Sequence, residues 1–443
     1  DAPAGHDAWV RAEAHVLLYL RLAHGDGGAS ARAAHVAVGR YLAVLAGTGA
    51  GRALMPAYLS TLPRDDAVAH AAEAWAPVED PAERAVLLDA ADAWLDGALV
   101  LSIVEEATRR VLAAPYEDGP DAAVEAVLRP TEDGGREHAV RVRPSALRKL
   151  RAVTWLAVRD AHLPSGLRAC NALLRRLLLN DRDGDPHAVA AAQLLVARYF
   201  PRERVDGAQE AVASALANDD DDDNDGEADR ALERLQRSLV EYGALYALLE
   251  AHLAFGLWKE TLLRHLDAPP PPAPVATTGG HTRWNVTERE VADKRARAHW
   301  ERECTEAAAE VIDATERSVA AWTSVLKFPG GWLSDEDDVA EDPAEQADTA
   351  AVRAHGLSLA VRLLQHVLGE AAGWATRFGG TAADVYAVDC VRVAVELANV
   401  VARDEHGILE CLEGDGLELF MEEVTRIAKV LVDLTGGIQV TGS

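Results

Sequence analysis

With 443 residues the chain is too long for one ordinary compact core, so we expect either two or three domains or one elongated stack of helices. Hydrophobic residues make up 49% and aromatic residues only 5%, and the richness in Ala and Leu, the strongest apolar helix formers, favours the stack. The 72 acidic and 44 basic residues give a formal net charge of −28, which argues against direct binding to nucleic acid or anionic lipid headgroups.

The spacing of apolar residues predicts helices along almost the whole chain. Apolar side chains recur three and four positions apart, and about 15 to 20 helices are expected from typical helix and loop lengths. Turns are predicted at glycine- and proline-rich positions, namely 25–28, 47–49, 63, 77–81, 115–120 and 183–186. No repeat of fixed period is present, so we expect an all-α fold, an irregular α-helical solenoid of stacked antiparallel helices.

Two acidic runs and one proline-rich segment interrupt the helical pattern. The runs at 219–225 and 334–348 predict flexible loops because like charges repel one another, and the proline-rich segment predicts a semi-rigid linker. We therefore divide the chain into a helical trunk segment at 1–266 with an acidic loop at 219–227, a Pro-rich linker at 267–283, and a C-terminal helical tail module at 284–443 that binds a partner.

One candidate strand and the last helix complete the pattern. The alternating segment 138–143 ends at Pro144 and predicts at most an isolated ribbon, without a sheet to join. The last helix carries an apolar stripe from Leu417 to Leu434, and we expect Gly436 and Gly437 to end it.

The acidic run at 219–225 is the main candidate for a metal site. Asp221, Asp223, Asp225 and Gly226 match the first half of a calcium-binding EF-hand loop, but the twelfth position is Leu232 where a bidentate Glu is needed. The run also resembles the aspartate-rich magnesium motif of all-α terpene synthases. Five consecutive Asp residues would point to all sides of a helix and could not line one cavity, so an all-α Mg-dependent enzyme is the less favoured alternative.

The sequence carries no other recognisable catalytic or cofactor motif. HExxH, paired CxxC and GxSxG patterns are absent, so we predict no enzyme, no metal and no cofactor. The four cysteines are far apart and are expected to be reduced thiols in a cytosolic or nuclear compartment. No stretch approaches the ~18 apolar residues of a membrane span, and the first ten residues lack a signal-peptide layout, so no direct membrane insertion is expected.

Ten tryptophans are many for a chain with so few aromatic residues. Most are expected to fix helix crossings in a core otherwise lined by Ala, and one or two could be interface anchors.

Seven segments are similar, in the same order, to one known family. They are the helix, Leu-Pro turn, helix pattern of Met55–Val68, the Trp-Leu helix pair of Ala152–Leu156 and Ala169–Leu179, the helix ending in an aromatic-x-x-Trp pattern at Tyr246–Trp258, the Gly-Gly-Trp helix exit of Val325–Leu333, and the closing helices at Leu397–Val401 and Asp404–Val432. On these segments the chain resembles the C-terminal half of the nucleoporin 107 family of animals, called nucleoporin 84 in yeast. The likeness covers nearly the whole chain.

The resemblance implies a scaffold subunit of the Y-shaped complex of the nuclear pore, located in the nucleus at the nuclear envelope. Such a subunit supports pore assembly and nucleocytoplasmic transport of mRNA and protein. Its C-terminal helices bind the C-terminal helical domain of a nucleoporin 133 type subunit. Contact with a nucleoporin 96 type subunit belongs to upstream helices, which we expect to be missing because the chain opens in mid-pattern.

Carried over from the resemblance, the partner surface falls on the end of the chain. The predicted partner-binding residues are Asn399, Val400, Arg403, His406, Leu409, Leu412, Phe420 and Met421. The last helix of a stack has one face without a neighbour in its own chain, so that face is either polar or covered by a partner. Two alternatives stay open: these side chains fold back into the core of their own chain, or the chain is a vesicle-coat or tethering α-solenoid.

Overall fold

A computed structural model describes most of the chain. The described residues are 6–24, 29–116, 118, 122–127, 139–182, 185, 187–217, 226–266, 283–329, 331–333, 343–378, 381–403, 407–412 and 416–440. Among them are sixteen α-helices and two short strands, which confirms the all-α solenoid prediction. The contacts divide the chain into two compact units, Asp1–Tyr242 and Gly243–Ser443, with the boundary inside one long helix.

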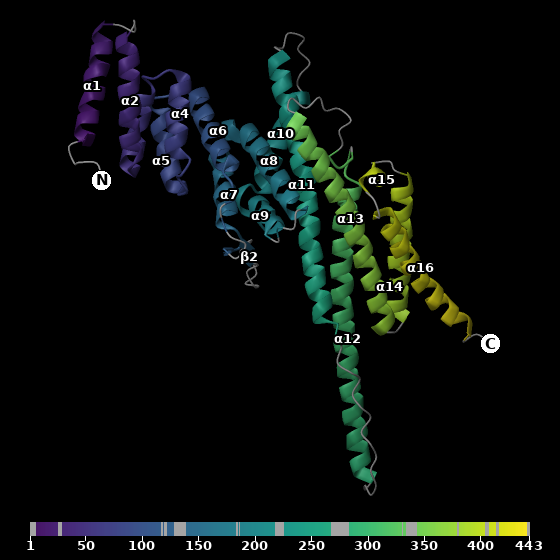
Figure 1. Cartoon of the computed structure of the whole chain (residues 1–443). Helices are drawn as coiled ribbons and strands as arrows, with labels where there is room; N and C mark the ends of the chain where they lie inside the picture. The colour runs from purple at the N-terminus through teal and green to yellow at the C-terminus, as the bar shows by residue number, and fades with distance from the viewer. Residues whose placement is uncertain are drawn as a thin grey trace. The chain divides into compact units, whose positions relative to one another are not determined.

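The first unit is a row of mostly short helices. They are α1 (His6–His24), α2 (Ala29–Ala46), α3 (Gly49–Leu59), α4 (Arg64–Trp75), α5 (Pro81–Asp92), α6 (Gly97–Ala113), α7 (Pro144–Ala157), α8 (Leu163–Arg182), α9 (Ala188–Leu194) and α10 (Arg202–Ala217), with a 3₁₀ turn η1 (Asp160–His162), a π-helical turn η2 (Leu195–Tyr199), and the first part of α11 (Gly226–Arg264). Successive helices lie side by side in Figure 1, as in a solenoid.

Side-chain caps begin several of these short helices where the sequence predicts turns. The Oγ1 of Thr48 accepts a hydrogen bond from the Gly51 amide at 3.0 Å, and the Oδ1 of Asp96 accepts one from the Leu99 amide at 2.8 Å. Asp80 caps α5 in the same way, with Pro81 as its first helical residue. Each cap satisfies a backbone amide that the helix itself leaves without a partner, and is typically worth about 1 kcal/mol.

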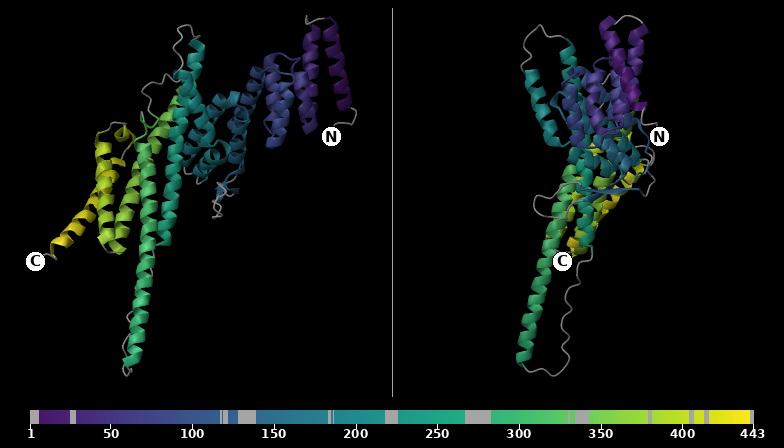
Figure 2. Two further views of the ribbon diagram at one scale, coloured as in Figure 1. Left: turned by 180° about the vertical axis from the view of Figure 1, so that it is seen from behind. Right: turned by 90° about the vertical axis from the view of Figure 1, so that its left-hand side faces the viewer.

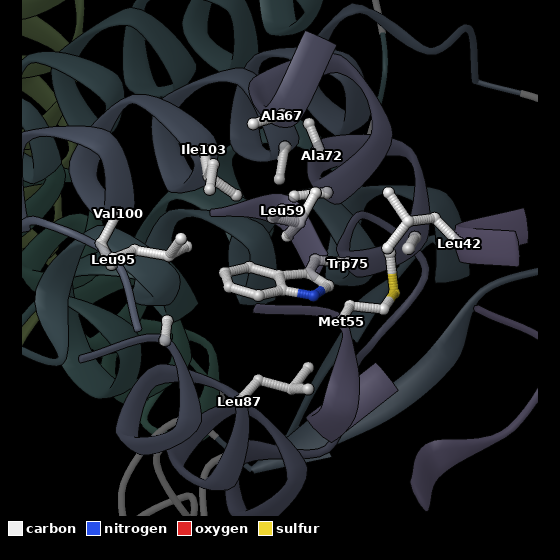
Figure 3. Close-up of a cluster of buried hydrophobic side chains, with 14 of the residues drawn as sticks. Leu42, Met55, Leu59, Ala67, Ala72, Trp75, Leu87, Leu95, Val100 and Ile103 are labelled. Carbon is white, nitrogen blue, oxygen red and sulfur yellow. The ribbon is translucent and has the colours of Figure 1, made fainter. Parts of the chain in front are cut away.

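Trp75 is the largest side chain at the centre of the first unit's core. Its ring lies among apolar side chains from α2, α3, α5 and α6, including Leu42, Leu59, Leu87 and Ile103 (Figure 3). It also stacks on Trp155 of α7, with ring centroids 5.8 Å apart. The helix, Leu-Pro turn, helix segment at 55–68 is thus the junction of α3 and α4, with Leu59 fully buried and Pro63 preceding α4.

The one expected ribbon is present. Strands β1 (Val124–Val127) and β2 (Ala139–Val142) pair antiparallel, with Val124 opposite Val142. They form a two-stranded sheet that no other strand of the described residues joins.

The second unit contains the end of α11 and longer helices. These are α12 (Arg283–Leu326), α13 (Pro343–Phe378), α14 (Thr381–Arg403), the single turn α15 (Ile408–Cys411) and α16 (Gly416–Val440). Its core includes Trp258 of α11, Val311 and Ala314 of α12, and Trp374 of α13. The indole of Trp258 donates a hydrogen bond to the Thr315 hydroxyl at 3.1 Å, which fixes the crossing of α11 and α12.

The Gly-Gly-Trp segment after α12 places a tryptophan between helices α11 and α13. Gly331 has φ of 86°, a left-handed conformation that favours glycine, and the turn inserts Trp332, which is 1% exposed. The Trp332 indole donates to the Ala244 carbonyl of α11 at 2.7 Å, and its ring lies against Gly356 of α13. A side chain at position 356 would collide with that ring, so the absence of a Cβ atom at Gly356 leaves the space that the indole occupies.

The first half of α12 extends beyond its neighbours in the unit. It projects past the ends of α11 and α13 in both views of Figure 2. Between Val291 and Glu310 every side chain that the structure describes is exposed or half-buried, and the first buried one is Val311. We call the segment 291–310 the α12 arm.

Three helix boundaries differ from those expected. Helix α16 continues through Gly436 and Gly437 to Val440, because glycine weakens a helix by about 1 kcal/mol without forbidding helical dihedrals. Helix α13 begins at Pro343, inside the acidic segment predicted as a loop, since Pro at a first turn and an acidic first turn both favour a helix start. Helix α11 runs on from Trp258 to Arg264.

Several predicted segments lie outside the described residues. They are the turn at 25–28, the acidic run 219–225 with the EF-hand-like Asp221, Asp223 and Asp225, the Pro-rich residues 267–282, and positions 334–342 of the second acidic run. The trunk, linker and tail division therefore stays a prediction. None of the helices, as far as their residues are described, combines the length and the apolar character needed to cross a membrane.

Candidate partner-binding surface

The predicted surface residues that the structure describes lie on three helices of the second unit, α14, α15 and α16, and at Leu412, the residue that follows α15. Helices α14 and α16 both pack on α13, and they also pack on each other, with the short α15 between them in sequence. The end of α14, all of α15 and the start of α16 follow one another closely along the chain. The end of α14, α15 and the start of α16 therefore lie at one corner of the unit (Figure 1).

Helix α16 is held by the residues on one side of its apolar stripe. Phe420 and Ile427 are 2% and 1% exposed, two turns apart on the same face. The buried Gln365 of α13 donates a hydrogen bond from its Nε2 to the Phe420 carbonyl at 3.0 Å. One turn further on, the ion pair of Glu423 and Arg426, with 2.5 Å between the nearest oxygen and nitrogen, covers Gly369 of α13.

The structure separates the eight predicted residues by burial. Leu412 and Phe420 are buried in the core of their own chain, and Val400 is half-buried. Asn399, Arg403, Leu409 and Met421 are exposed, with 40% of Leu409 and 52% of Met421 accessible. His406 lies outside the described residues. The exposed members can contact a partner directly, whereas Leu412 and Phe420 can only position them.

Further apolar side chains at this corner were not predicted. Leu417 and Leu419 of α16 are 39% and 57% exposed, next to Met421. The sequence contained a signal for Leu419, because this leucine lies off the apolar stripe of its own helix and has no core to enter.

Helix α14 adds a second strip of exposed apolar side chains. Val388 and Val395 are 41% and 45% exposed, and with Arg392 and Asn399 they follow a three- and four-residue spacing that places all four on one helix face. The two valines add exposed apolar surface to this face of α14.

Charged side chains surround these apolar residues. Glu410, Glu418 and Glu422 are exposed, and the exposed cations of the same helices include Arg392, Arg403, Arg426 and Lys429. A surface with apolar anchors and a charged rim has the usual layout of a protein–protein interface, where the rim selects the partner and the apolar centre supplies most of the affinity.

Two potentially reactive groups of this unit, Cys390 and Tyr386, are protonated at neutral pH because they are largely removed from water. Burial raises the pKa of the Cys390 thiol of α14 to about 12, and it also raises the pKa of the neighbouring Tyr386 hydroxyl. A thiol in that state is a poor nucleophile and a poor metal ligand. Within the part of the chain that the structure describes, no three His, Cys, Asp or Glu side chains gather closely enough to hold a metal ion.

Most tryptophans fix helix crossings, as expected. Trp75, Trp155, Trp258, Trp322 and Trp332 are among the most buried large side chains. Trp9 and Trp94 are exceptions, at 77% and 61% exposed, and Trp9 lines a cavity of about 930 Å³ along α1 and α2 with Val16 and Val44.

Comparison with known proteins gives one match. The family model described as nuclear pore protein 84 / 107 matches residues 4–428, which is nearly the whole chain. A search of curated protein sequences found no match.

Proposed function

Because the chain belongs to the nuclear pore protein 84 / 107 family and is therefore a scaffold nucleoporin of the nuclear pore, we propose that its C-terminal corner binds a nucleoporin 133 type subunit. In this proposal the chain works by holding a helical partner and not by catalysis. It thereby supports assembly of the Y-shaped complex, and through it the transport of mRNA and protein across the nuclear envelope.

The observation that carries the proposal is the group of exposed apolar side chains on α15 and the start of α16. Leu409, Leu417, Leu419 and Met421 are 39% to 57% exposed, while Phe420 between them is buried and holds the helix in place. Burying such side chains against a partner is worth on the order of 1 kcal/mol each, from about 25 cal/mol per Å² of apolar surface. The neighbouring Glu410, Glu418 and Glu422 favour a partner with basic side chains at the rim.

The test replaces exposed anchors and leaves the core intact. A Leu419→Glu, Met421→Glu double variant places two carboxylates in the proposed contact, where a buried charge without a partner is strongly unfavourable. Binding to the C-terminal helical domain of a nucleoporin 133 type subunit, measured by isothermal titration calorimetry, should weaken at least a hundredfold, on the order of 3 kcal/mol. Phe420→Glu is unsuitable because it would disrupt the fold itself.

Leu54→Glu is the matched control. Leu54 of α3 is 58% exposed, as Leu419 is at 57%, but it lies in the first unit and outside the proposed surface. Both variants should retain the far-ultraviolet circular dichroism of the original chain. Unchanged affinity of the double variant, or equal weakening by Leu54→Glu, would refute this surface.

The vesicle-coat alternative has no support beyond the shared helical architecture. The family match favours the pore, and no described feature of the chain favours a coat or tether.

A further inference from the structure

A second hollow lies in the first unit, far in sequence from the C-terminal corner. It has a volume of about 590 Å³ and is bounded by the start of α5, one side of α7, the π-turn η2 and the start of α10. Four arginines line it: Arg84, Arg151, Arg198 and Arg204. We call it the arginine cavity.

Arg84 is a buried cation held by neutral groups. It is 3% exposed, and its Nε donates to the Val78 carbonyl at 3.0 Å while its Nη1 donates to the Thr154 hydroxyl at 2.7 Å and to the Arg151 carbonyl. Its guanidinium carbon lies 4.9 Å from the centre of the Trp155 ring. Burial lowers its pKa to about 10, which leaves it charged at neutral pH.

Both carboxylates of the cavity already have hydrogen-bond partners. Glu79 accepts from Arg151 at 2.7 Å and also from Arg148, outside the cavity, at 3.2 Å. Asp80 caps α5 by accepting from the Ala82 amide at 3.0 Å. The lining thus contains four arginines and two carboxylates, an excess of two positive charges (4 − 2) in a chain whose formal net charge is −28.

The π-turn brings one of these cations to the cavity. The amide of Phe200 donates to the Leu195 carbonyl at 2.7 Å, the five-residue step of a π-helix, and this turn carries both Arg198 and Tyr199. The Tyr199 hydroxyl accepts a hydrogen bond from Arg151, which helps to raise the Arg151 pKa. Single π-turns inside α-helical segments are rare and are frequently found at functional sites.

Arg204 supplies a second, independent indication of a ligand. Its Nε atom is buried, yet it has no hydrogen-bond partner among the described residues. A buried donor without an acceptor is unfavourable, so the Arg204 guanidinium has hydrogen-bonding capacity that the described residues leave unused.

We propose that the arginine cavity binds a phosphate monoester dianion. Several guanidinium groups converging on one hollow are the usual protein receptor for phosphate, because their planar donor forks match its oxygens. The two excess positive charges equal the charge of the dianion. The same chemistry is offered by a phosphorylated side chain of another protein and by a small soluble phosphate.

The test titrates the intact chain with inorganic phosphate, followed by ³¹P nuclear magnetic resonance at constant ionic strength. We expect saturable binding to one site, weakened about tenfold or more by an Arg198→Gln, Arg204→Gln double variant, since each charge-assisted hydrogen bond contributes strongly to binding. An Arg11→Gln, Arg32→Gln variant removes the same charge from exposed positions on α1 and α2 and should bind as the original chain does. Arg84 is left in place because its loss would disturb the core.

Two further ligands identify the source of the phosphate. A short phosphoserine peptide that binds more tightly than inorganic phosphate, while its unphosphorylated form does not bind, indicates a phosphorylated protein. Tighter binding of inositol hexakisphosphate than of the phosphopeptide indicates a small soluble phosphate. Binding that does not saturate, or that is equal in the original chain and both double variants, would overturn the proposal and leave the arginines a purely structural charge network.

Discussion

Gly356 of α13 is the position at which the packing of Trp332 can be tested most directly. A Cβ atom added there would lie 2.3 Å and 2.5 Å from two carbons of the Trp332 six-membered ring. The ring cannot easily withdraw, because its Nε1 donates to the Ala244 carbonyl at 2.7 Å and the side chain is 1% exposed. Gly356→Ala should therefore force the indole or α13 to move.

The magnitude follows from two opposing terms. Overpacking a well-packed core costs about 1–3 kcal/mol, whereas Gly→Ala inside a helix stabilises it by about 1 kcal/mol. Gly373 lies in the same helix, and a Cβ added there would meet nothing within 4 Å, so Gly373→Ala keeps only the favourable term. The difference in unfolding free energy between the two variants should be about 1–3 kcal/mol, with Gly356→Ala the less stable.

The assay is urea-induced unfolding followed by circular dichroism, comparing the midpoints of the original chain and both variants. Trp332→Phe removes the outer ring atoms that an alanine at position 356 would meet. Gly356→Ala should therefore lower the unfolding free energy less in a Trp332→Phe variant than in the original chain, and a double-mutant cycle measures this difference. Equal midpoint shifts in the two glycine variants would refute the reasoning and show that the indole is not fixed.

Two further predictions concern charged side chains of the first unit. Arg175→Met should lower the unfolding free energy measured in urea by about 3–5 kcal/mol, because Arg175 and Glu241 form an ion pair with side chains only 5% and 20% exposed. The matched surface variant Arg392→Met should change the unfolding free energy by less than about 1 kcal/mol. Similar small effects in both variants would contradict burial of the pair. Glu106 accepts hydrogen bonds from Arg109 and Arg110, which lower its pKa from 4.5 to about 2. Its contribution is therefore complete above about pH 4.5 and is lost as the pH falls towards 2, so Glu106→Gln should flatten the fall of the urea midpoint across that interval; an unchanged slope would contradict the assignment.

Helical periodicity and turn residues predicted the fold well. The junctions at Thr48, Pro63 and Asp80 lie where the sequence placed turns, because capping side chains and Pro act locally. The predicted end of α16 was wrong, because glycine at 436 and 437 weakens a helix without ending it.

The candidate surface was harder to predict than the helices. Periodicity shows that Phe420 and Met421 both belong to an apolar stripe, but not which of the two enters the core, since that depends on how α16 is rotated on α13. Phe420 is 2% exposed and Met421 52%. The sequence contains no signal for the arginine cavity, because Arg84, Arg151 and Arg204 belong to three helices that are far apart along the chain.

The free energy needed to break backbone hydrogen bonds differs between the α12 arm and the rest of the same helix. Beyond Val311 the backbone hydrogen bonds are shielded by packed neighbours, so breaking them requires the unit to open. Over most of the arm they rest on local helix propensity and on pairs such as His299 with Glu303, 3.4 Å apart and one turn along. Packing begins at the end of the arm, where Ala308 lies against the core and Glu310 pairs with His265 of α11 at 2.9 Å. The arm can thus fray and re-form on its own while the rest of the same helix stays folded.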